Sequence, residues 1–262
     1  GLEWGSMPSS ELPPFPNKPH DIDTNETALK KYKADKREVH DEHAVIKSKR
    51  ILFTKVLLAA KKCLNYEEIY YPLQLDFRGR VYCVPAFLNY QSVGGAKALI
   101  RFTNGKPITH ENKGIFWLAI HGANCWGNDK VALADRHKWV EENTEWIEAC
   151  GKDPIANLQW NDADEPYQFL AFCDEWARYK QEGEGFISHI PVAVDGSCNG
   201  LQLYSLMLRD EKAGKLVNLT VTDKPQDIYQ AVADSVREKV RKDATDGVPF
   251  AQAWLNYGIT RK

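Results

Sequence analysis

The strongest candidate for chemistry in this sequence is the acidic residue Asp195. It ends a mostly apolar run over residues 186–194 and is followed directly by Gly196. A strand that ends in a carboxylate holds that group rigidly, and glycine allows close approach, so the pattern is typical of a catalytic or metal-binding acid. The alternative is that Asp195 caps the helix expected over residues 201–207 or closes an Asx turn. A single acid in this place is more often a cap than a ligand.

A second candidate is the pair of arginines on either side of Gly79. Arg78 and Arg80 lie between two β-rich segments, residues 69–75 and 81–84, so we expect a hairpin with a tight glycine turn. Guanidinium groups match phosphate oxygens in a bidentate way, which favours phosphate binding at this turn. The alternative is a surface hairpin tip whose arginines only keep it soluble.

Other classes of chemistry are disfavoured by the motifs. The sequence has no H-E-x-x-H pair, no G-x-x-x-x-G-K-[ST] loop and no G-x-S-x-G elbow, which argues against zinc hydrolases, P-loop NTPases and serine hydrolases. The six cysteines form no C-x-x-C pair, so we expect free thiols in a reducing compartment. Lys97, Lys130 and Tyr229 are polar residues that, one by one, are more often surface residues than ligands.

Composition and charge indicate a folded chain with segregated charge. Its 262 residues are 43% hydrophobic and 27% charged, which excludes a disordered or fibrous protein, and no apolar run is long enough to cross a membrane. The net charge is −2, yet residues 30–62 hold eleven Lys and Arg against four acids. This stretch is either a phosphate-binding surface or a solvated helix face.

Periodicity and turn signals predict a mainly helical chain after a proline-rich arm at residues 1–22. Residues 23–25 offer helix-capping side chains. We expect helices over residues 28–43, 44–64, 112–125, 132–150, 166–182, 201–207, 225–241 with Pro225 at the first helical position, and 249–257. We expect strands over residues 69–75, 81–84, 186–194 and 217–221.

Taken together and in order, several segments resemble the single-subunit DNA-directed RNA polymerases of bacteriophages and mitochondria. The resemblance runs from about Glu11 to Lys262 with collinear spacing. The segments that carry it are residues 75–82 (which include D-F-R-G-R), 104–108, 120–125, 129–131, 140–143, 169–173, 195–202 (which begin with D-G-S-C-N-G), 208–211, 217–219 and 225–229.

The resemblance implies an α+β fold, namely a predominantly helical fragment of a right-hand polymerase (palm, fingers and thumb) with a small antiparallel palm sheet. The implied segments are an extended arm (1–22), a basic helical segment (23–66), a hairpin and palm-proximal segment (67–110), an acidic helical subdomain (111–185), the palm motif with Asp195 (186–224) and helices leading into the fingers (225–262).

The resemblance also implies roles for individual residues. Asp195 would be catalytic and, with the Gly196 carbonyl, would bind the two Mg²⁺ ions of the complete enzyme. Gly200 stands where similar DNA polymerases carry a glutamate that clashes with a 2′-hydroxyl, so it would favour ribonucleotides. The nucleotide would contact Arg80, Lys130, Tyr229 and Arg261, and the nucleic acid would contact Arg78, Arg80 and Lys97.

The implied function is transfer of NMP from an NTP to an RNA 3′ hydroxyl on a DNA template, by a single-subunit enzyme with DNA, RNA and NTPs as partners. The lack of a transit-like N-terminus and the compact spacing of the segments favour a phage enzyme in the cytoplasm of its host over a mitochondrial one. We expect the chain alone to be inactive, because the family's fingers lysine and second metal aspartate are not in it. Leu203 replaces a family histidine, which leaves that contact open. The alternatives are a noncatalytic nucleic-acid-binding module on a polymerase-like scaffold, and a structural α+β protein.

Overall fold

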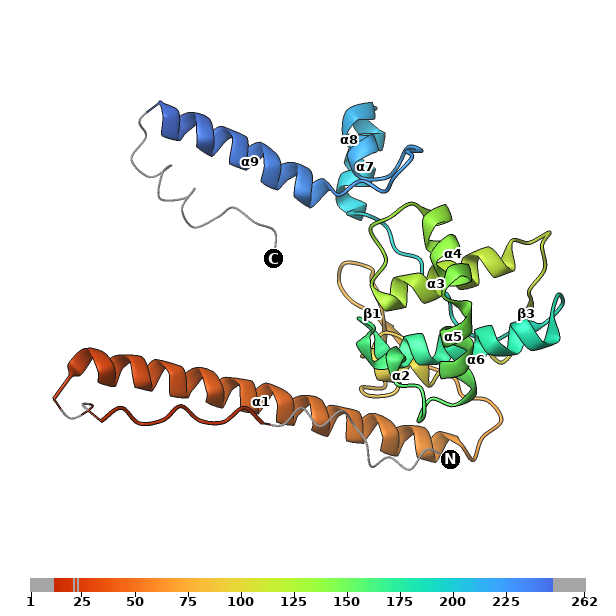
Figure 1. The fold of residues 1–262 in the computed structure, drawn as a ribbon. Coiled ribbons are helices and arrows are strands. Elements are labelled where there is room, and N and C mark those ends of the chain that lie inside the picture. Colours follow the sequence, from red (N-terminus) through yellow and green to blue (C-terminus); the bar gives the residue numbers. More distant parts are fainter. Residues whose placement is uncertain (1–11, 21, 23, 247–262) are drawn as a thin grey trace. The chain divides into compact units, whose positions relative to one another are not determined.

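The computed structural model describes residues 12–20, 22 and 24–246, and it divides the chain into two compact units, residues 1–103 and 104–262 (Figure 1). Helices predominate in the described residues, and the strands form two antiparallel pairs. The chain is therefore an α+β protein, as predicted. The expected helix over residues 249–257 lies outside the described residues.

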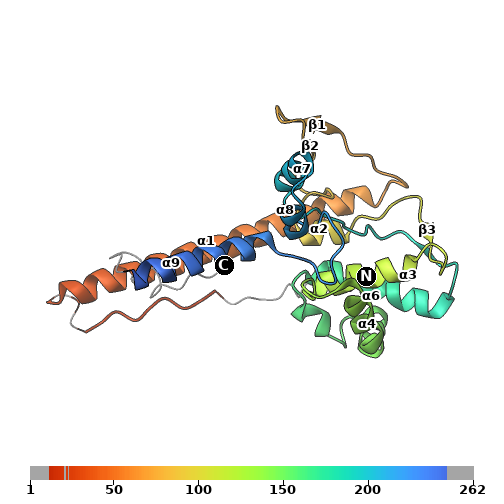
Figure 2. The ribbon, with the colours of Figure 1, turned by 90° about the horizontal axis from the view of Figure 1, so that it is seen from above.

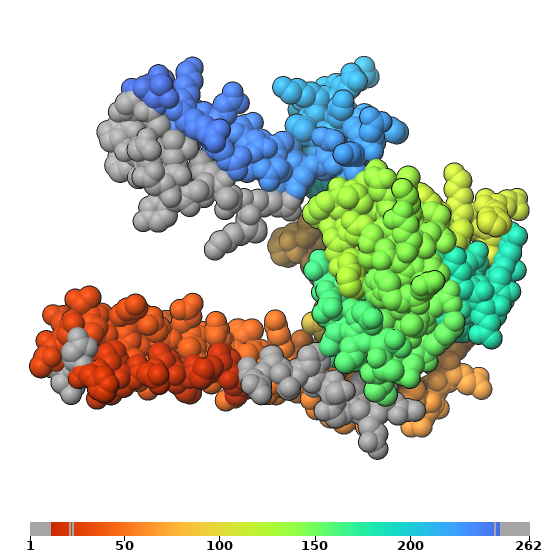
Figure 3. All heavy atoms as spheres, in the orientation of Figure 1, coloured from red at the N-terminus to blue at the C-terminus, as the bar shows by residue number. Residues whose placement is uncertain are grey.

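The first unit is dominated by one long helix, α1 (Glu26–Cys63). The sequence predicts two helices here, and this is wrong, because neither glycine nor proline interrupts the stretch. Asn25 caps the helix by accepting a hydrogen bond from Ala28 N at 3.1 Å, which the predicted capping segment anticipates. Val56 is the helix's one buried residue, so α1 exposes most of its surface (Figure 3).

The remaining elements of this unit are the strands β1 (Leu73–Leu75) and β2 (Val81–Cys83) and the short helix α2 (Gly94–Ala98). The strands pair antiparallel with Gln74 opposite Tyr82, which confirms the predicted hairpin. Gly79 stands in its turn with φ of 76°, a conformation that glycine adopts without strain. A small core is formed by Val56, Leu88 and Ala96.

The second unit begins with a helical bundle whose core is unusually aromatic. Its elements are β3 (Lys106–Pro107), α3 (Gly114–Trp126), α4 (Leu133–Glu142), α5 (Thr144–Lys152), the 3₁₀ helix η1 (Gln159–Asp162), α6 (Pro166–Glu182) and β4 (Ile187–Ser188). The helices expected over residues 112–125 and 166–182 are confirmed. The single helix expected over residues 132–150 is broken at Asn143, whose side-chain amide donates to the Trp139 carbonyl and accepts from the Trp146 indole.

Two glycines allow the helices of the bundle to approach closely. A Cβ on Gly122 of α3 would lie 2.3 Å from the Phe172 ring of α6, and one on Gly151 of α5 would lie 2.2 Å from the Cys173 carbonyl oxygen. Phe172 and Cys173 are both fully buried. The bundle core therefore depends on these two positions having no side chain.

Glu175 of α6 fixes the chain where it leaves the bundle. Its side chain is fully buried, and Oε1 accepts hydrogen bonds from Ser188 Oγ and His189 N, both at 2.8 Å. The strand expected over residues 186–194 is wrong beyond Ser188, and Val194 is 84% exposed. An apolar run needs neighbouring strands to become a buried strand, and among the described residues only β3 pairs with it.

Helices α7 (Asn199–Leu208), α8 (Glu211–Leu216) and α9 (Ile228–Thr245) follow. Figure 1 and Figure 2 both show α7 beside α8. The strand expected over residues 217–221 is wrong, because this segment turns back on the end of α8 through Leu219 N and Gly214 O at 2.9 Å. Helix α9 starts three residues after Pro225, since the Asp227 side chain caps it.

None of the helices in the described residues combines the length and the apolar character that a membrane span requires.

Candidate active site

Asp195 lies in an irregular, exposed segment between β4 and α7. Its carboxylate Oδ1 accepts a hydrogen bond from the adjacent Gly196 N at 2.8 Å. The N-cap of α7 is Cys198, which has a φ of 61° and makes no side-chain capping bond. Asp195 therefore does not cap the helix that follows it, and the alternative raised by the sequence is wrong in this respect.

The two glycines of this segment have different surroundings. A Cβ on Gly196 would lie 2.4 Å from Asn199 Oδ1, so the turn is tight at this point. A Cβ on Gly200, in the first turn of α7, would meet nothing within 4 Å. The Asn199 side chain is exposed and can turn aside, so packing in the described residues requires only a shift of Asn199 at position 196 and leaves room for a larger side chain at position 200.

The donors at this turn suit a hard cation, although they do not complete a site. The Asp195 carboxylate and the Gly196 carbonyl are oxygen ligands of the type that Mg²⁺ prefers. Among the described residues, no group of three or more His, Cys, Asp or Glu side chains could hold a metal. The described chain therefore offers one carboxylate to such a site.

Tyr229 is the predicted site residue that the structure brings to this turn. It lies in the first turn of α9, where Asp227 Oδ1 accepts hydrogen bonds from Tyr229 N at 3.0 Å and Gln230 N at 3.2 Å. A side-chain interaction with Cys198, followed by the negative charge of its thiolate form and by burial, raises the pKa of Tyr229. Residues 31 positions apart in the sequence are thus neighbours.

Lys130 lies in the turn between α3 and α4, where its ammonium group pairs with the carboxylate of Asp129. A buried residue that the sequence analysis missed, Arg136, organises this turn. Its guanidinium donates to the Asn124 side chain at 2.7 Å and to the carbonyls of Asp129 and Val131 at 2.8 and 3.1 Å. No described contact joins Lys130 to the Asp195 turn.

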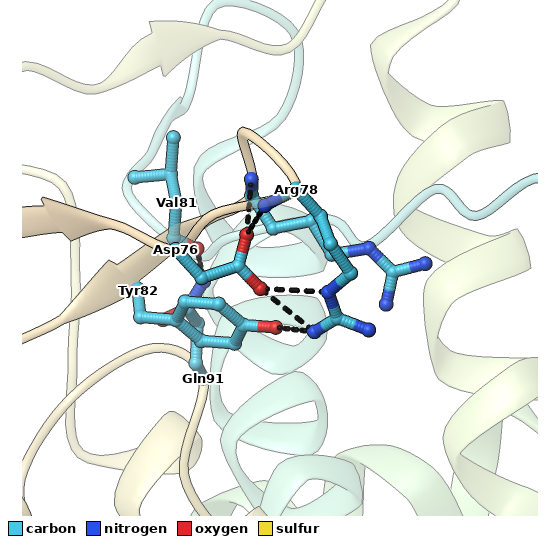
Figure 4. Close-up of polar contacts among 6 residues, drawn as sticks. Asp76, Arg78, Val81, Tyr82 and Gln91 are labelled. Atoms are coloured by element: carbon cyan, nitrogen blue, oxygen red, sulfur yellow. Dashed lines mark hydrogen bonds and ion pairs between the residues drawn. The ribbon is translucent and has the colours of Figure 1, made fainter.

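The hairpin of the first unit is built around Asp76, as Figure 4 shows. Oδ1 accepts hydrogen bonds from Arg78 N at 2.8 Å and Arg80 N at 3.0 Å, while Oδ2 accepts from Arg78 Nε at 2.9 Å and Nη2 at 2.7 Å. Burial raises the pKa of Asp76, but the hydrogen bonds from Arg80 and Arg78 outweigh it, and the pKa is lowered. Asp76 is therefore the ionised centre of the turn.

The two arginines of the hairpin differ in their surroundings. Arg78 is held by Asp76 and donates from Nη2 to the Tyr82 hydroxyl at 3.1 Å. The Arg80 side chain makes no hydrogen bond or ion pair with the described residues. Lys97 is exposed on α2 in the same unit, and Arg261 lies outside the described residues.

Two more residues, outside the predicted set, support these sites. Gln91 pairs with the outer edge of β2, accepting from Cys83 N at 2.7 Å and donating to Val81 O at 2.8 Å. Asn218 links the Asp195 turn to the start of α9.

The role of Asp76 in the hairpin could have been predicted from the sequence, because Asp with glycine three residues later is typical of a side-chain-stabilised turn.

Comparison with known proteins identifies the class. A model of the DNA-dependent RNA polymerase family matches residues 108–262. This match covers more than half of the chain, so the chain belongs to that family, as its motifs predicted.

Its relatives come from phages and mitochondria. The chain is 41% identical to the DNA-directed RNA polymerase of Enterobacteria phage T3 and 40% identical to T7 RNA polymerase of Escherichia phage T7, with 99% of this chain covered in each case. It is 37% identical over its whole length to the mitochondrial DNA-directed RNA polymerase of Schizosaccharomyces pombe, of which it covers 22%. The chain spans about a third of the length of the two phage relatives, 32% of each.

Proposed function

We propose that this chain forms part of an enzyme that synthesises RNA on a DNA template. The reaction joins the RNA 3′ oxygen to the α-phosphorus of an NTP and releases pyrophosphate. The observation that carries the proposal is the state of Asp195, which is exposed in a tight turn and is not used to cap α7.

We assign Asp195 and the Gly196 carbonyl as ligands of two catalytic Mg²⁺ ions in the complete protein. Such ions, when bound, favour the ionised 3′ hydroxyl and the leaving pyrophosphate. The chain's own contribution is to display the oxygen donors in an exposed turn, where Gly196 N donates to Asp195 Oδ1 at 2.8 Å. The remaining carboxylate belongs, in this proposal, to a part of the protein beyond the 262 residues, which alone are inactive.

The other site residues are assigned by the resemblance to the polymerase family. In this proposal the incoming nucleotide contacts Arg80, Lys130, Tyr229 and Arg261. The nucleic acid contacts Arg78, Arg80 and Lys97. Gly200 selects ribonucleotides by leaving space for a 2′-hydroxyl, in agreement with the open space around it. Arg80 is better placed than Arg78 to bind a phosphate, because the Arg78 guanidinium already donates two hydrogen bonds to the Asp76 carboxylate.

The proposal extends to the architecture and the setting. We assign residues 186–224 to the palm and α9 to the approach to the fingers of a right-hand polymerase. The partners are a DNA template, an RNA transcript and NTPs, and the enzyme acts as a single subunit. The identities favour a phage-type enzyme in the cytoplasm of its host over a mitochondrial one.

The test is template-directed synthesis by the complete protein that carries this chain. We expect incorporation of ribonucleotides into RNA that requires the DNA template and Mg²⁺, and none by the 262 residues alone. Binding of DNA without incorporation under any Mg²⁺ concentration would contradict the proposal. That result would favour a noncatalytic binding module that uses the exposed basic surface of α1 (Glu26–Cys63).

A further inference from the structure

Asn218 makes an unusual set of contacts for a residue in a short turn. It stands just after α8 with a φ of 58°, in the left-handed region that asparagine tolerates better than most residues. Its Nδ2 donates to Ser197 Oγ and to Gln226 O, both at 2.8 Å, and its Oδ1 accepts from Gln226 N at 2.7 Å. One amide group thereby joins three separate segments of the chain.

The turn that carries Asn218 is itself well fixed. The Asn218 and Leu219 amides donate to the carbonyls of Lys215 and Gly214 at the end of α8, at 3.2 and 2.9 Å. The neighbouring Val217 is 1% exposed, and its carbonyl accepts from Gln202 Nε2 of α7 at 2.8 Å. The Asn218 side chain is therefore presented from a rigid base.

The segments that Asn218 joins carry the proposed site residues. Ser197 is two residues after Asp195, in the turn that displays the acid. Gln226 is followed by Asp227, which caps α9 and so places Tyr229 in the first turn of that helix. Cys198, in the Asp195 turn, also raises the pKa of Tyr229, so these two side chains lie within reach of each other.

We propose that Asn218 is a positioning residue that sets the spacing between the Asp195 turn and Tyr229. This rests on the proposed function, in which Asp195 holds the cations and Tyr229 contacts the nucleotide. Asparagine fits the task because it donates to two oxygens and accepts from one N–H. Aspartate keeps the backbone preference but replaces the donor by an acceptor that would face Ser197 Oγ and the Gln226 carbonyl.

The first experiment measures the Asp195 turn directly, in the 262-residue chain. The rate at which iodoacetamide alkylates Cys198 is followed by peptide mapping, with Cys63 and Cys83 of the other unit as internal references. We expect Asn218→Asp and Asn218→Gly to raise the Cys198 rate at least about threefold, because the thiol loses its fixed neighbours. Glycine tolerates a φ of 58°, so the second variant keeps the turn and removes only the amide.

The matched control is Thr222→Ala. It removes a hydrogen bond from Thr222 Oγ1 to Lys224 O in the same loop, and it leaves in place the bond that Gln226 Nε2 donates to the same carbonyl at 3.0 Å. We expect its Cys198 rate to stay at the wild-type value. If alkylation of the buried Cys125 and Cys150 shows that Asn218→Asp unfolds the chain, the Asn218→Gly rate decides.

The second experiment uses the complete polymerase with the same variants. We expect Asn218→Asp to lower kcat for ribonucleotide incorporation at least about tenfold while template binding stays unchanged, and Thr222→Ala to stay within about twofold of wild type. An unchanged Cys198 rate in both Asn218 variants would overturn the proposal, as would a raised rate with an unchanged kcat. Failure of the wild-type polymerase to incorporate nucleotides would instead overturn the proposed function.

Discussion

Glu175 provides the sharpest test of how the chain is held between the bundle and Asp195. In Glu175→Ala, Ser188 Oγ and His189 N lose a buried acceptor at 2.8 Å. Each donor that loses this acceptor costs about 1–3 kcal/mol, and the lower part of the range applies because both donors are only half-buried. We expect the free energy of unfolding to fall by about 2–4 kcal/mol.

The isosteric change Glu175→Gln separates the hydrogen bonds from the charge. Its amide oxygen still accepts both bonds, and the carboxylate it replaces lies 3.9 Å from Arg178 Nη1, a long ion pair. Removing a buried charge also removes its desolvation cost, so we expect a change within about 1 kcal/mol. Glu182→Ala, on the exposed side of the same helix, is the matched control and should stay within about 0.5 kcal/mol.

Urea unfolding followed by tryptophan fluorescence is the appropriate assay. Six of the eight tryptophans lie in the described part of the second unit, namely Trp117, Trp126, Trp139, Trp146, Trp160 and Trp176, so the signal reports on that unit. The alanine variant should lower the urea midpoint with an unchanged slope. Equal losses in Glu175→Ala and Glu175→Gln would refute the reasoning, because they would show that charge rather than hydrogen bonding holds β4.

Three further predictions concern the second unit. Burial lowers the pKa of His121 to about 4 from 6.5, so the folded state binds fewer protons than the unfolded state between these values. The free energy of unfolding therefore falls as the pH drops. We expect a loss of about 2 kcal/mol between pH 7 and pH 5 that is absent in His121→Gln. Gly151→Ala and Gly122→Ala should each destabilise the bundle by about 1–3 kcal/mol in urea unfolding, with Gly151→Ala the worse because backbone cannot move aside. Gly200→Ala should leave stability unchanged or raise it by up to about 1 kcal/mol, and Gly200→Glu in the complete polymerase should lower the preference for ribonucleotides over deoxyribonucleotides at least about tenfold.

Each of these has a result that counts against it. The same pH dependence in wild type and His121→Gln would show that other groups cause the loss. A neutral Gly151→Ala would mean that α5 and α6 can separate without cost. An unchanged nucleotide preference in Gly200→Glu, with the fold intact by circular dichroism, would remove Gly200 from the site.

The local signals in the sequence were sufficient where one short stretch decides the structure. Neighbouring residues alone decide three features that the structure confirms: the Asn25 cap, the hairpin around Gly79 and the helix from Pro166 to Glu182. The family could also be predicted, because ten collinear segments carried the resemblance and the family comparison confirms it.

The errors arose where partners distant in the sequence decide the structure. Residues 190–194 are apolar, but only the two residues of β4 find a pairing strand among the described residues. Helix α9 starts at Ile228 and not at the predicted Pro225, because Asn218 and Asp227 hold the residues before it by hydrogen bonds. The contact between Tyr229 and Cys198 could not be predicted from periodicity, since it depends on how two helices leave separate turns.

The measurement that tests the account most directly is template-directed ribonucleotide incorporation by the complete polymerase with Asp195→Asn. Asp223→Asn, an exposed acid in the loop before α9, is the matched control. We expect Asp195→Asn to lose nearly all incorporation while it binds template DNA as the wild type does, and Asp223→Asn to keep its activity. Incorporation at the wild-type rate by Asp195→Asn would contradict the assignment of this residue to the catalytic site.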